Sequence, residues 1–183
     1  QNTLIGGLAG DALTEADANV AIGKGALTTD TLGSSSVAVG NNALTNQNFT
    51  SATDTYNVAV GKNAGLAVTT GIQNTFIGGL SGDATTTANN NAAFGYGSLG
   101  ANTTGAQNVA LGSGALFNNT TASNNTAVGI NSLLANTTGA SNVAVGAFAL
   151  DANTTASNNT AVGYASLTAN TTGRDNTALG FSA

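Results

Sequence analysis

The chain has 183 residues, of which only 6% are charged, and eight acidic and three basic side chains give it a net charge of −5. It contains no Pro, Cys, Met, Trp or His, which excludes disulfides, zinc–thiolate clusters, thiolate nucleophiles and imidazole bases. Three basic residues cannot neutralise a nucleic-acid backbone, and no apolar run is long enough to cross a membrane. We therefore expect no nucleic-acid partner and no membrane span in this segment.

An internal repeat organises the whole chain. Its mark is the pentad Asn-[Thr/Val]-Ala-[Val/Ile/Leu]-Gly, whose glycine recurs with a 17-residue period and one longer interval, between Gly40 and Gly61. This spacing divides the chain into eleven coils, and the four-residue insertion falls in the third coil, 36–56. The coils start near residues 2, 19, 36, 57, 74, 91, 108, 125, 142, 159 and 176. We number the positions within a coil from 1, the Asn, to 17.

Each pentad predicts one short strand, because small and β-branched residues alternate between a bounding Asn and Gly. A glycine at position 5 suits a backbone that turns with positive φ. A 17-residue period is too short for a pair of helices, and we expect a second short strand near positions 7 to 11. Stacking each strand in parallel on its copy in the next coil gives an all-β fold, a parallel β-solenoid or β-roll. The Asn residues at position 1 would then stack as a hydrogen-bonded ladder.

Positions 3 and 9 indicate which side chains lie inside the predicted roll. Position 3 is Ala in nine coils, and the exceptions are Leu4 and Phe76. In those two coils position 9 is Gly10 or Gly82 instead of the usual Leu. This exchange of large for small predicts that positions 3 and 9 share one enclosed volume.

Three details leave other interpretations open. In coil four Ala59 at position 3 accompanies Gly65 at position 9, so Leu66 is the candidate to fill the space. Leu8 and Leu80 at position 7 allow another interpretation, in which the leucine of position 9 has only moved along the chain in these two coils. Positions 2 and 4, which also carry large apolar residues, could themselves form the core.

If position 3 is inside, positions 2 and 4 face outward, because side chains alternate along a strand. They then form an apolar stripe along the whole rod, which a monomer would not leave in water. We expect parallel copies of the chain to associate through this stripe. The predicted oligomer interface consists of Val20, Ile22, Val37, Val39, Val58, Val60, Ile77, Phe94, Val109, Leu111, Val128, Val143, Val145, Val162 and Leu179.

The insertion in coil three is the most distinctive local feature. It places aromatic residues in a polar loop, and insertions in solenoids often lie on a binding face. Gln47, Phe49 and Tyr56 are therefore candidates for a binding loop, and the alternative is a tolerated bulge. Because the chain starts and ends in mid-repeat, we also expect it to be an internal segment of a longer fibre polypeptide.

The pentads Asn-Val-Ala-Val-Gly at 57–61 and 142–146, and Ser-Val-Ala-Val-Gly at 36–40, resemble the head repeat of trimeric autotransporter adhesins, the YadA-like head. The longer form Asn-Thr-Ala-Val-Gly-Tyr-x-Ser-Leu-x-x-Asn-Thr-Thr-Gly, which starts at residue 159, also resembles repeats of phage tail fibres. The resemblance implies a left-handed β-roll and a trimer of such rolls. This sequence departs from the family in its period, because the family's usual coil is shorter than the coil found here.

These features predict a structural and adhesive fibre segment on a phage tail fibre or a bacterial surface adhesin. Such a segment would be extracellular, on a cell surface or a virion, and its partners would be copies of itself and a surface receptor or glycan. The residues form no catalytic constellation and no metal or cofactor motif, so we expect neither an enzyme nor a cofactor.

Two other functions stay open at this point. A β-solenoid that binds ice or another repetitive surface would use stacked Thr columns, but the adjacent Thr residues at positions 13 and 14 are expected to point to opposite faces. A glycan-cleaving fibre enzyme would need paired carboxylates in a groove, and no column of the repeat supplies them.

Overall fold

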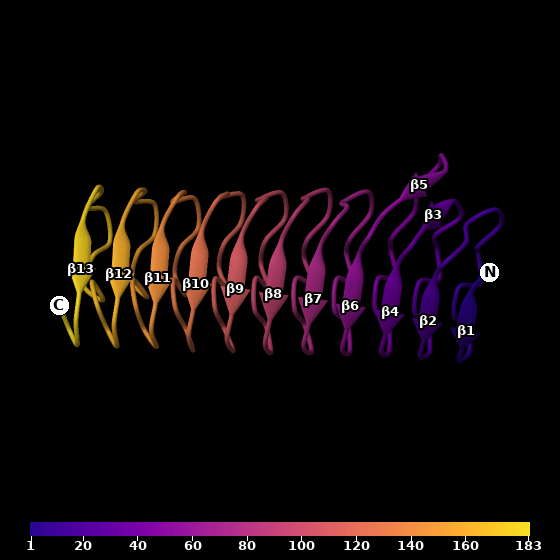
Figure 1. The fold of residues 1–183 in the computed structure, drawn as a ribbon, viewed down its shortest axis with the longest axis horizontal. Helices are drawn as coiled ribbons and strands as arrows, with labels where there is room; N and C mark the ends of the chain where they lie inside the picture. The colour runs from indigo at the N-terminus through magenta and orange to yellow at the C-terminus, as the bar shows by residue number, and fades with distance from the viewer.

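The computed structural model describes residues 1–183 as a rod in which one coil follows another, with the termini at opposite ends (Figure 1). One strand from each coil joins a single parallel sheet of eleven strands, and no residue is helical. These strands are β1 (Thr3–Ile5), β2 (Val20–Ile22), β4 (Val37–Val39), β6 (Val58–Val60), β7 (Thr75–Ile77), β8 (Ala92–Phe94), β9 (Val109–Leu111), β10 (Thr126–Val128), β11 (Val143–Val145), β12 (Thr160–Val162) and β13 (Thr177–Leu179). The predicted all-β parallel β-solenoid of 17-residue coils is confirmed.

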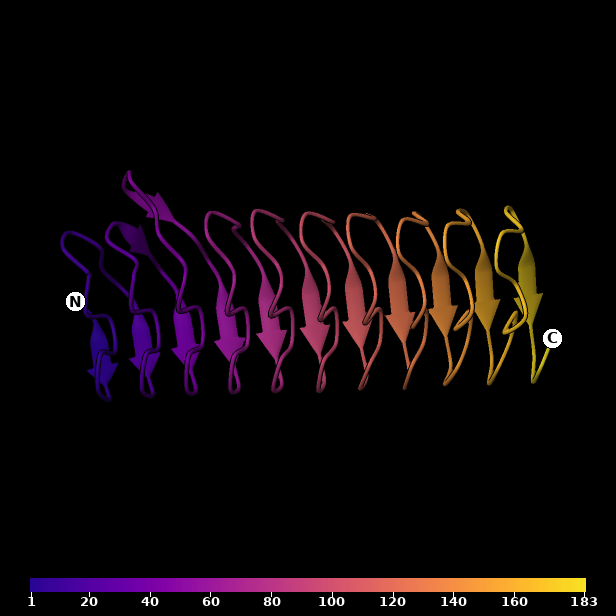
Figure 2. The same cartoon turned by 180° about the vertical axis from the view of Figure 1, so that it is seen from behind.

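Each strand pairs with its own copy one coil further on. Thr126 lies opposite Val143, for example, which is its equivalent in the next coil. Across the insertion Val37 lies opposite Val58, so the strands keep their register although the third coil is longer. The extra residues are accommodated outside the main sheet, where β3 (Gly33–Ser34) and β5 (Thr53–Asp54) form a separate two-stranded sheet. This pair projects beyond the edge at which the main strands begin (Figures 1 and 2).

Glycine ends every strand of the main sheet. All eleven glycines at position 5 have φ between +128° and +140°, a region that side chains rarely adopt. A Cβ on Gly61 would also lie 2.5 Å from the carbonyl oxygen of Gly78 in the next coil. Position 5 is therefore restricted to Gly both by its dihedral angle and by the close stacking of the coils.

The predicted second strand near positions 7 to 11 is wrong. That segment is a succession of turns, because positions 7 and 9 both have positive φ, as at Asn131 (+53°) and Leu133 (+52°). The N–H of Ser132 donates to the carbonyl of Gly129, which together with the positive φ at Asn131 is typical of a type II turn. Coil-to-coil hydrogen bonds continue here, as from Leu133 to Ala149.

Burial explains why leucine is tolerated in a left-handed conformation at position 9. That conformation costs about 1–2 kcal/mol for a residue with a side chain. The Leu133 side chain is fully buried, and burying a leucine contributes about 1.5–3 kcal/mol. The two terms are of the same size, so the turn remains compatible with leucine wherever the side chain fills the core.

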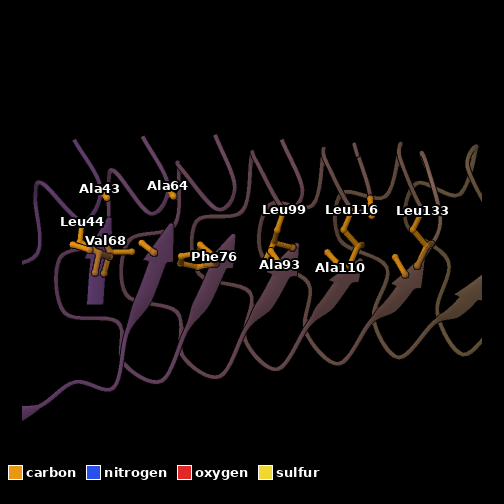
Figure 3. Close-up of a cluster of buried hydrophobic side chains, with 14 of the residues drawn as sticks. Ala43, Leu44, Ala64, Val68, Phe76, Ala93, Leu99, Ala110, Leu116 and Leu133 are labelled. Atoms are coloured by element: carbon orange, nitrogen blue, oxygen red, sulfur yellow. The ribbon is translucent and has the colours of Figure 1, made fainter. Parts of the chain in front are cut away.

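The apolar core runs along the rod from Ala9 to Ala161, mainly between positions 3, 8 and 9. Figure 3 shows the central part of this core. Ala93 and Ala110 at position 3 are fully buried beside Leu99 and Leu116 at position 9. The exchange of large for small is confirmed, because a Cβ on Gly82 would overlap the ring of Phe76. Positions 3 and 9 therefore share one volume, as the sequence predicts.

Coil four fills the space above its glycine in a way that the sequence does not predict. Val68, at position 12, is fully buried, whereas Leu66 stays half-exposed. A Cβ on Gly65 would lie 2.9 Å from Leu44 and 3.0 Å from Phe76, which belong to the coils on either side. The prediction that Leu66 fills this space is therefore wrong, because neighbouring coils and Val68 already occupy the volume.

Two ladders of Asn side chains form a polar interior beside the apolar core. At position 1 the backbone N–H of Asn142 donates to Oδ1 of Asn125 (2.9 Å), and the amide of Asn125 donates to the carbonyl of Gly139 (2.9 Å). At position 12 the amide of Asn136 donates to Oδ1 of Asn119 (3.0 Å) and to the same Gly139 carbonyl (2.9 Å). The ladder predicted at position 1 is confirmed, and the second ladder uses the Asn of the Asn-Thr-Thr triplets.

Candidate interaction surface

The outward face of the main sheet is a mainly apolar stripe that follows the rod from end to end, with a large apolar residue at position 4 of every coil and Thr at position 2 of five coils. Along each central strand position 3 is buried while positions 2 and 4 are partly exposed. Every residue of the predicted oligomer interface lies on this face, and none of them is buried. Phe94 and Leu111 are the most exposed away from the ends, at 39% and 37%. The interpretation with positions 2 and 4 in the core is excluded, and self-association through the stripe stays a prediction.

The stripe has no charged residue, and its two flanks differ in chemistry. We call the positions just before each strand, 16 and 17, the start edge, and position 6, just after each strand, the end edge. The end edge exposes Tyr96 (65%), Ile130 and Tyr164. The start edge exposes amides such as Gln107 and Asn124. Sequence reasoning did not single out the end edge, although its large residues recur at every second coil from Lys24 to Tyr164.

Aromatic rings stack near the C-terminus at positions 6 and 7, on and directly beside the end edge. The rings of Phe148 and Tyr164 meet edge to face with centroids 5.9 Å apart. The rings of Tyr164 and Phe181 are stacked with centroids 5.2 Å apart. Such pairs contribute about 0.5–1.5 kcal/mol beyond the area they bury, so they hold these side chains in a fixed arrangement at the surface.

The structure separates the three candidates for a binding loop in coil three. Gln47 and Phe49 are buried, so they do not present a binding surface, and only Tyr56 is exposed, at 56%. The Gln47 amide donates to Oδ2 of Asp30 (2.6 Å) and Oγ of Ser36 (2.8 Å). Its oxygen accepts from Asn57 (2.9 Å). Gln47 thus takes the place of a ladder Asn at position 12, and a binding role is left to Tyr56 alone.

Asp30 is a fully buried carboxylate at position 12 of coil two. Its Oδ1 accepts the backbone N–H groups of Gly33 (3.0 Å) and Phe49 (3.1 Å), and its Oδ2 accepts the Gln47 amide. These bonds tie the insertion to the coil before it. We call the β3–β5 pair together with the insertion of coil three the arm. Asp30 therefore supports the arm from inside and does not belong to an open site.

The face beyond the start edge carries the Thr columns of positions 13 and 14. The Thr137 hydroxyl donates to the carbonyl of Thr154 (3.1 Å), so position 13 is part of another internal ladder. Thr138 at position 14 is exposed, and the same difference recurs in the neighbouring coils. Position 13 is therefore partly buried and hydrogen-bonded, whereas position 14 is exposed to solvent.

The acidic residues do not assemble into a site. Asp11, Glu15 and Asp17 are exposed, as expected for solvated turns. Burial raises the pKa of the Asp83 carboxyl, although its own backbone N–H and that of Ala84 act in the opposite direction. The structure has no pocket, no group of three potential metal-ligating residues and no helix that could span a membrane.

Comparisons with known proteins add no family assignment. No protein-family model matches the chain, and no curated protein or solved structure matches it either.

Proposed function

We propose that the chain is a structural and adhesive fibre segment that acts outside the cell, on a phage tail fibre or a bacterial surface adhesin. Parallel copies associate along the apolar stripe, three being the number that the resemblance to YadA-like heads implies. The assembled rod provides length and stiffness, and it displays loops that attach to a surface receptor or glycan.

The stripe is the observation that carries this proposal. Its position 4 holds a large apolar side chain in all eleven coils, and these side chains are only partly buried in one chain. Completing their burial is worth about 1 kcal/mol each, or roughly 10 kcal/mol for the column, as an upper bound. Association costs about 4–15 kcal/mol in lost freedom, so burial of this face is comparable with that cost and provides the main driving force.

The coil-to-coil hydrogen bonds support a role as a stiff spacer. The main sheet, the turns and both Asn ladders all bond along the rod, as in the bonds from Val143 to Asn159 and from Asn136 to Asn119. Bending the rod would lengthen such bonds on one side. A structure that repeats the same bonds in every coil can extend without a change in design.

The tip of the arm in coil three, residues 50–52, is exposed and is the part best placed for attachment. The arm projects beyond the row of coils (Figure 2). Tyr56, which follows β5, is also exposed. Asp30 and Gln47 anchor the arm from inside. An aromatic side chain held on a rigid base can stack on a partner at little cost in conformational entropy.

One observation favours a second candidate, an ice-binding solenoid. Position 14 presents exposed threonines in successive coils, including Thr121, Thr138 and Thr155. At position 13 the hydroxyls of Thr103, Thr120, Thr137 and Thr154 already donate to the next coil, so only the column at position 14 is free to bind. Thermal hysteresis measured on the purified chain separates this candidate from the fibre, which predicts none.

Sedimentation of two variants at position 4 of coil nine tests the proposed function. Val145→Asp places an unpaired charge in the buried stripe and should convert the wild-type oligomer into a folded monomer. Val145→Thr keeps the shape of the side chain without a charge and should remain associated. An oligomer that persists in Val145→Asp would contradict the use of the stripe as the interface.

A further inference from the structure

The two flanks of the stripe carry opposite charges at the same two strands, β2 and β6. The only lysines of the chain, Lys24 and Lys62, both lie on the end edge, directly after β2 and β6. Asp17 precedes β2 at position 16 of the start edge. Asp54 precedes β6 and lies opposite Ser34, which holds the same position in coil two. All four charged side chains are exposed, so each of these two strands is bounded by an acid before it and a lysine after it.

A ring of parallel copies brings these two edges together. When copies are related by rotation about an axis along the rod, all their strands run in the same sense around that axis. The end of each strand then faces the start of the corresponding strand in the next copy, which is a heterologous contact that closes into a ring. At zero axial offset, Lys24 of one copy faces Asp17 of the next, and Lys62 faces Asp54.

The area of the stripe alone also requires the edges to take part. Eleven coils at ~4.8 Å and three strand residues at ~3.3 Å give a face of about 500 Å². A stable interface of standard size buries about 800 Å² on each partner. The contact must therefore extend past the stripe, and the exposed Tyr96, Ile130 and Tyr164 provide the apolar part of that extension on the end edge.

We infer that the end edge of one copy docks on the start edge of the next, with Lys24 paired to Asp17 and Lys62 to Asp54, and that these pairs fix the axial register of the assembly. This inference rests on the proposed self-association. The stripe repeats almost the same residues in every coil, so sliding by one coil changes its burial very little. An acid before the strand and a lysine after it occur together at β2 and β6 only, so an axial shift by one coil separates the pairs. The mixed charges of Arg174 and Asp175 on the start edge of coil ten leave this pattern unchanged.

Charge exchange tests the inference through the dissociation constant of the assembly at low salt. Lys24→Glu with Lys62→Glu should weaken association by about tenfold, because two attractions become two repulsions. Asp17→Lys with Asp54→Lys should weaken it by a similar factor. The variant with all four changes should regain wild-type association, because the reversed charges are again complementary. Asp11→Lys with Asp151→Lys, which adds the same charge away from both edges, should leave association unchanged.

The outcomes separate this inference from the proposed function. A monomeric wild-type chain would overturn both. A wild-type oligomer whose association is unaffected by the two charge-reversed variants, or is not restored in the fourfold variant, would overturn the edge pairing and leave the stripe interface standing. High salt should reduce the differences among all variants, since exposed pairs are screened.

Discussion

Single residues in this rod are constrained mainly by the coil stacked on them. Position 15 alternates Gly105, Ala122, Gly139 and Ala156 through the regular coils. A Cβ on Gly105 would overlap the carbonyl oxygen of Ala122 in the next coil, and the same holds for Gly139 with Ala156. This alternation, which repeats every two coils, therefore has a steric cause: every second coil must lack a side chain at position 15.

Gly105→Ala should destabilise the chain by about 1–3 kcal/mol, because the new methyl group forces two stacked backbones apart. Gly7→Ala is the matched control, since a Cβ there meets nothing within 4 Å. That variant should be neutral or more stable by up to about 1 kcal/mol, through a less flexible unfolded chain. Midpoints of urea unfolding measure both, and equal effects would contradict the steric account.

Ala144→Phe should overpack the core by about 1–3 kcal/mol when made alone. Adding Leu150→Gly recreates the arrangement of Phe76 over Gly82 and should recover part of that loss. The free energy of unfolding of the two single variants and the double variant provides the cycle. Strictly additive losses would show that positions 3 and 9 do not share their space.

Asp83 should make the folded chain less stable as the pH rises. Burial raises the pKa of its carboxyl in the folded state, so the folded chain holds this proton to a higher pH than the unfolded chain does. The associated stability is present below the unfolded pKa and is lost as the pH rises through the folded pKa. Asp83→Asn should remove this contribution, so its advantage in melting temperature over wild type should grow between pH 3 and pH 7. A constant difference would contradict the assignment.

At the scale of elements, the sequence predicts the strands better than the turns. The pentad identifies all eleven main strands, because β-branched residues and the terminal Gly act locally. The sequence predicts a strand in the segment after the pentad, because leucine rarely adopts the positive φ that the turns of this segment require. Leu133 adopts that conformation because its side chain is buried by neighbouring coils, which a local pattern does not reveal.

The candidate loop shows the same limit. Of the three candidates for a binding loop, Tyr56 is exposed, whereas Gln47 and Phe49 are buried by partners that are distant in sequence. Gln47 bonds to Asp30 in the preceding coil and to Asn57 in the following one. The signal that could have revealed this is positional, since Gln47 falls at position 12, where other coils place the ladder Asn.

Gln47→Ala should loosen the arm of coil three. It leaves a buried oxygen of Asp30 and the amide of Asn57 without one partner each, at a cost of about 1–3 kcal/mol. Hydrogen exchange should accelerate around β3 and β5, while the coils after 90 keep their protection. Asn46→Ala, at an exposed neighbouring position, should leave exchange unchanged. Uniform acceleration along the whole rod would contradict a local anchoring role.

At the scale of the whole molecule, one coil design produces two different surfaces. In the interior every buried side-chain polar atom has a hydrogen-bond partner, except Thr85 Oγ1. The outward stripe is not fully buried, because its side chains stay partly exposed in a single chain. Stacking of the repeated coils pairs the polar groups and packs the core inside the rod, but it leaves the same apolar face exposed in every coil. We therefore expect the chain to associate with itself.

The molar mass of the wild-type chain in solution tests this expectation most directly. Light scattering at micromolar concentration should give about three times the chain mass of 17.6 kDa, from a species that circular dichroism shows to be rich in β-structure. A folded monomer of 17.6 kDa at the same concentration would contradict the account, because the stripe would then be stable in water without a partner.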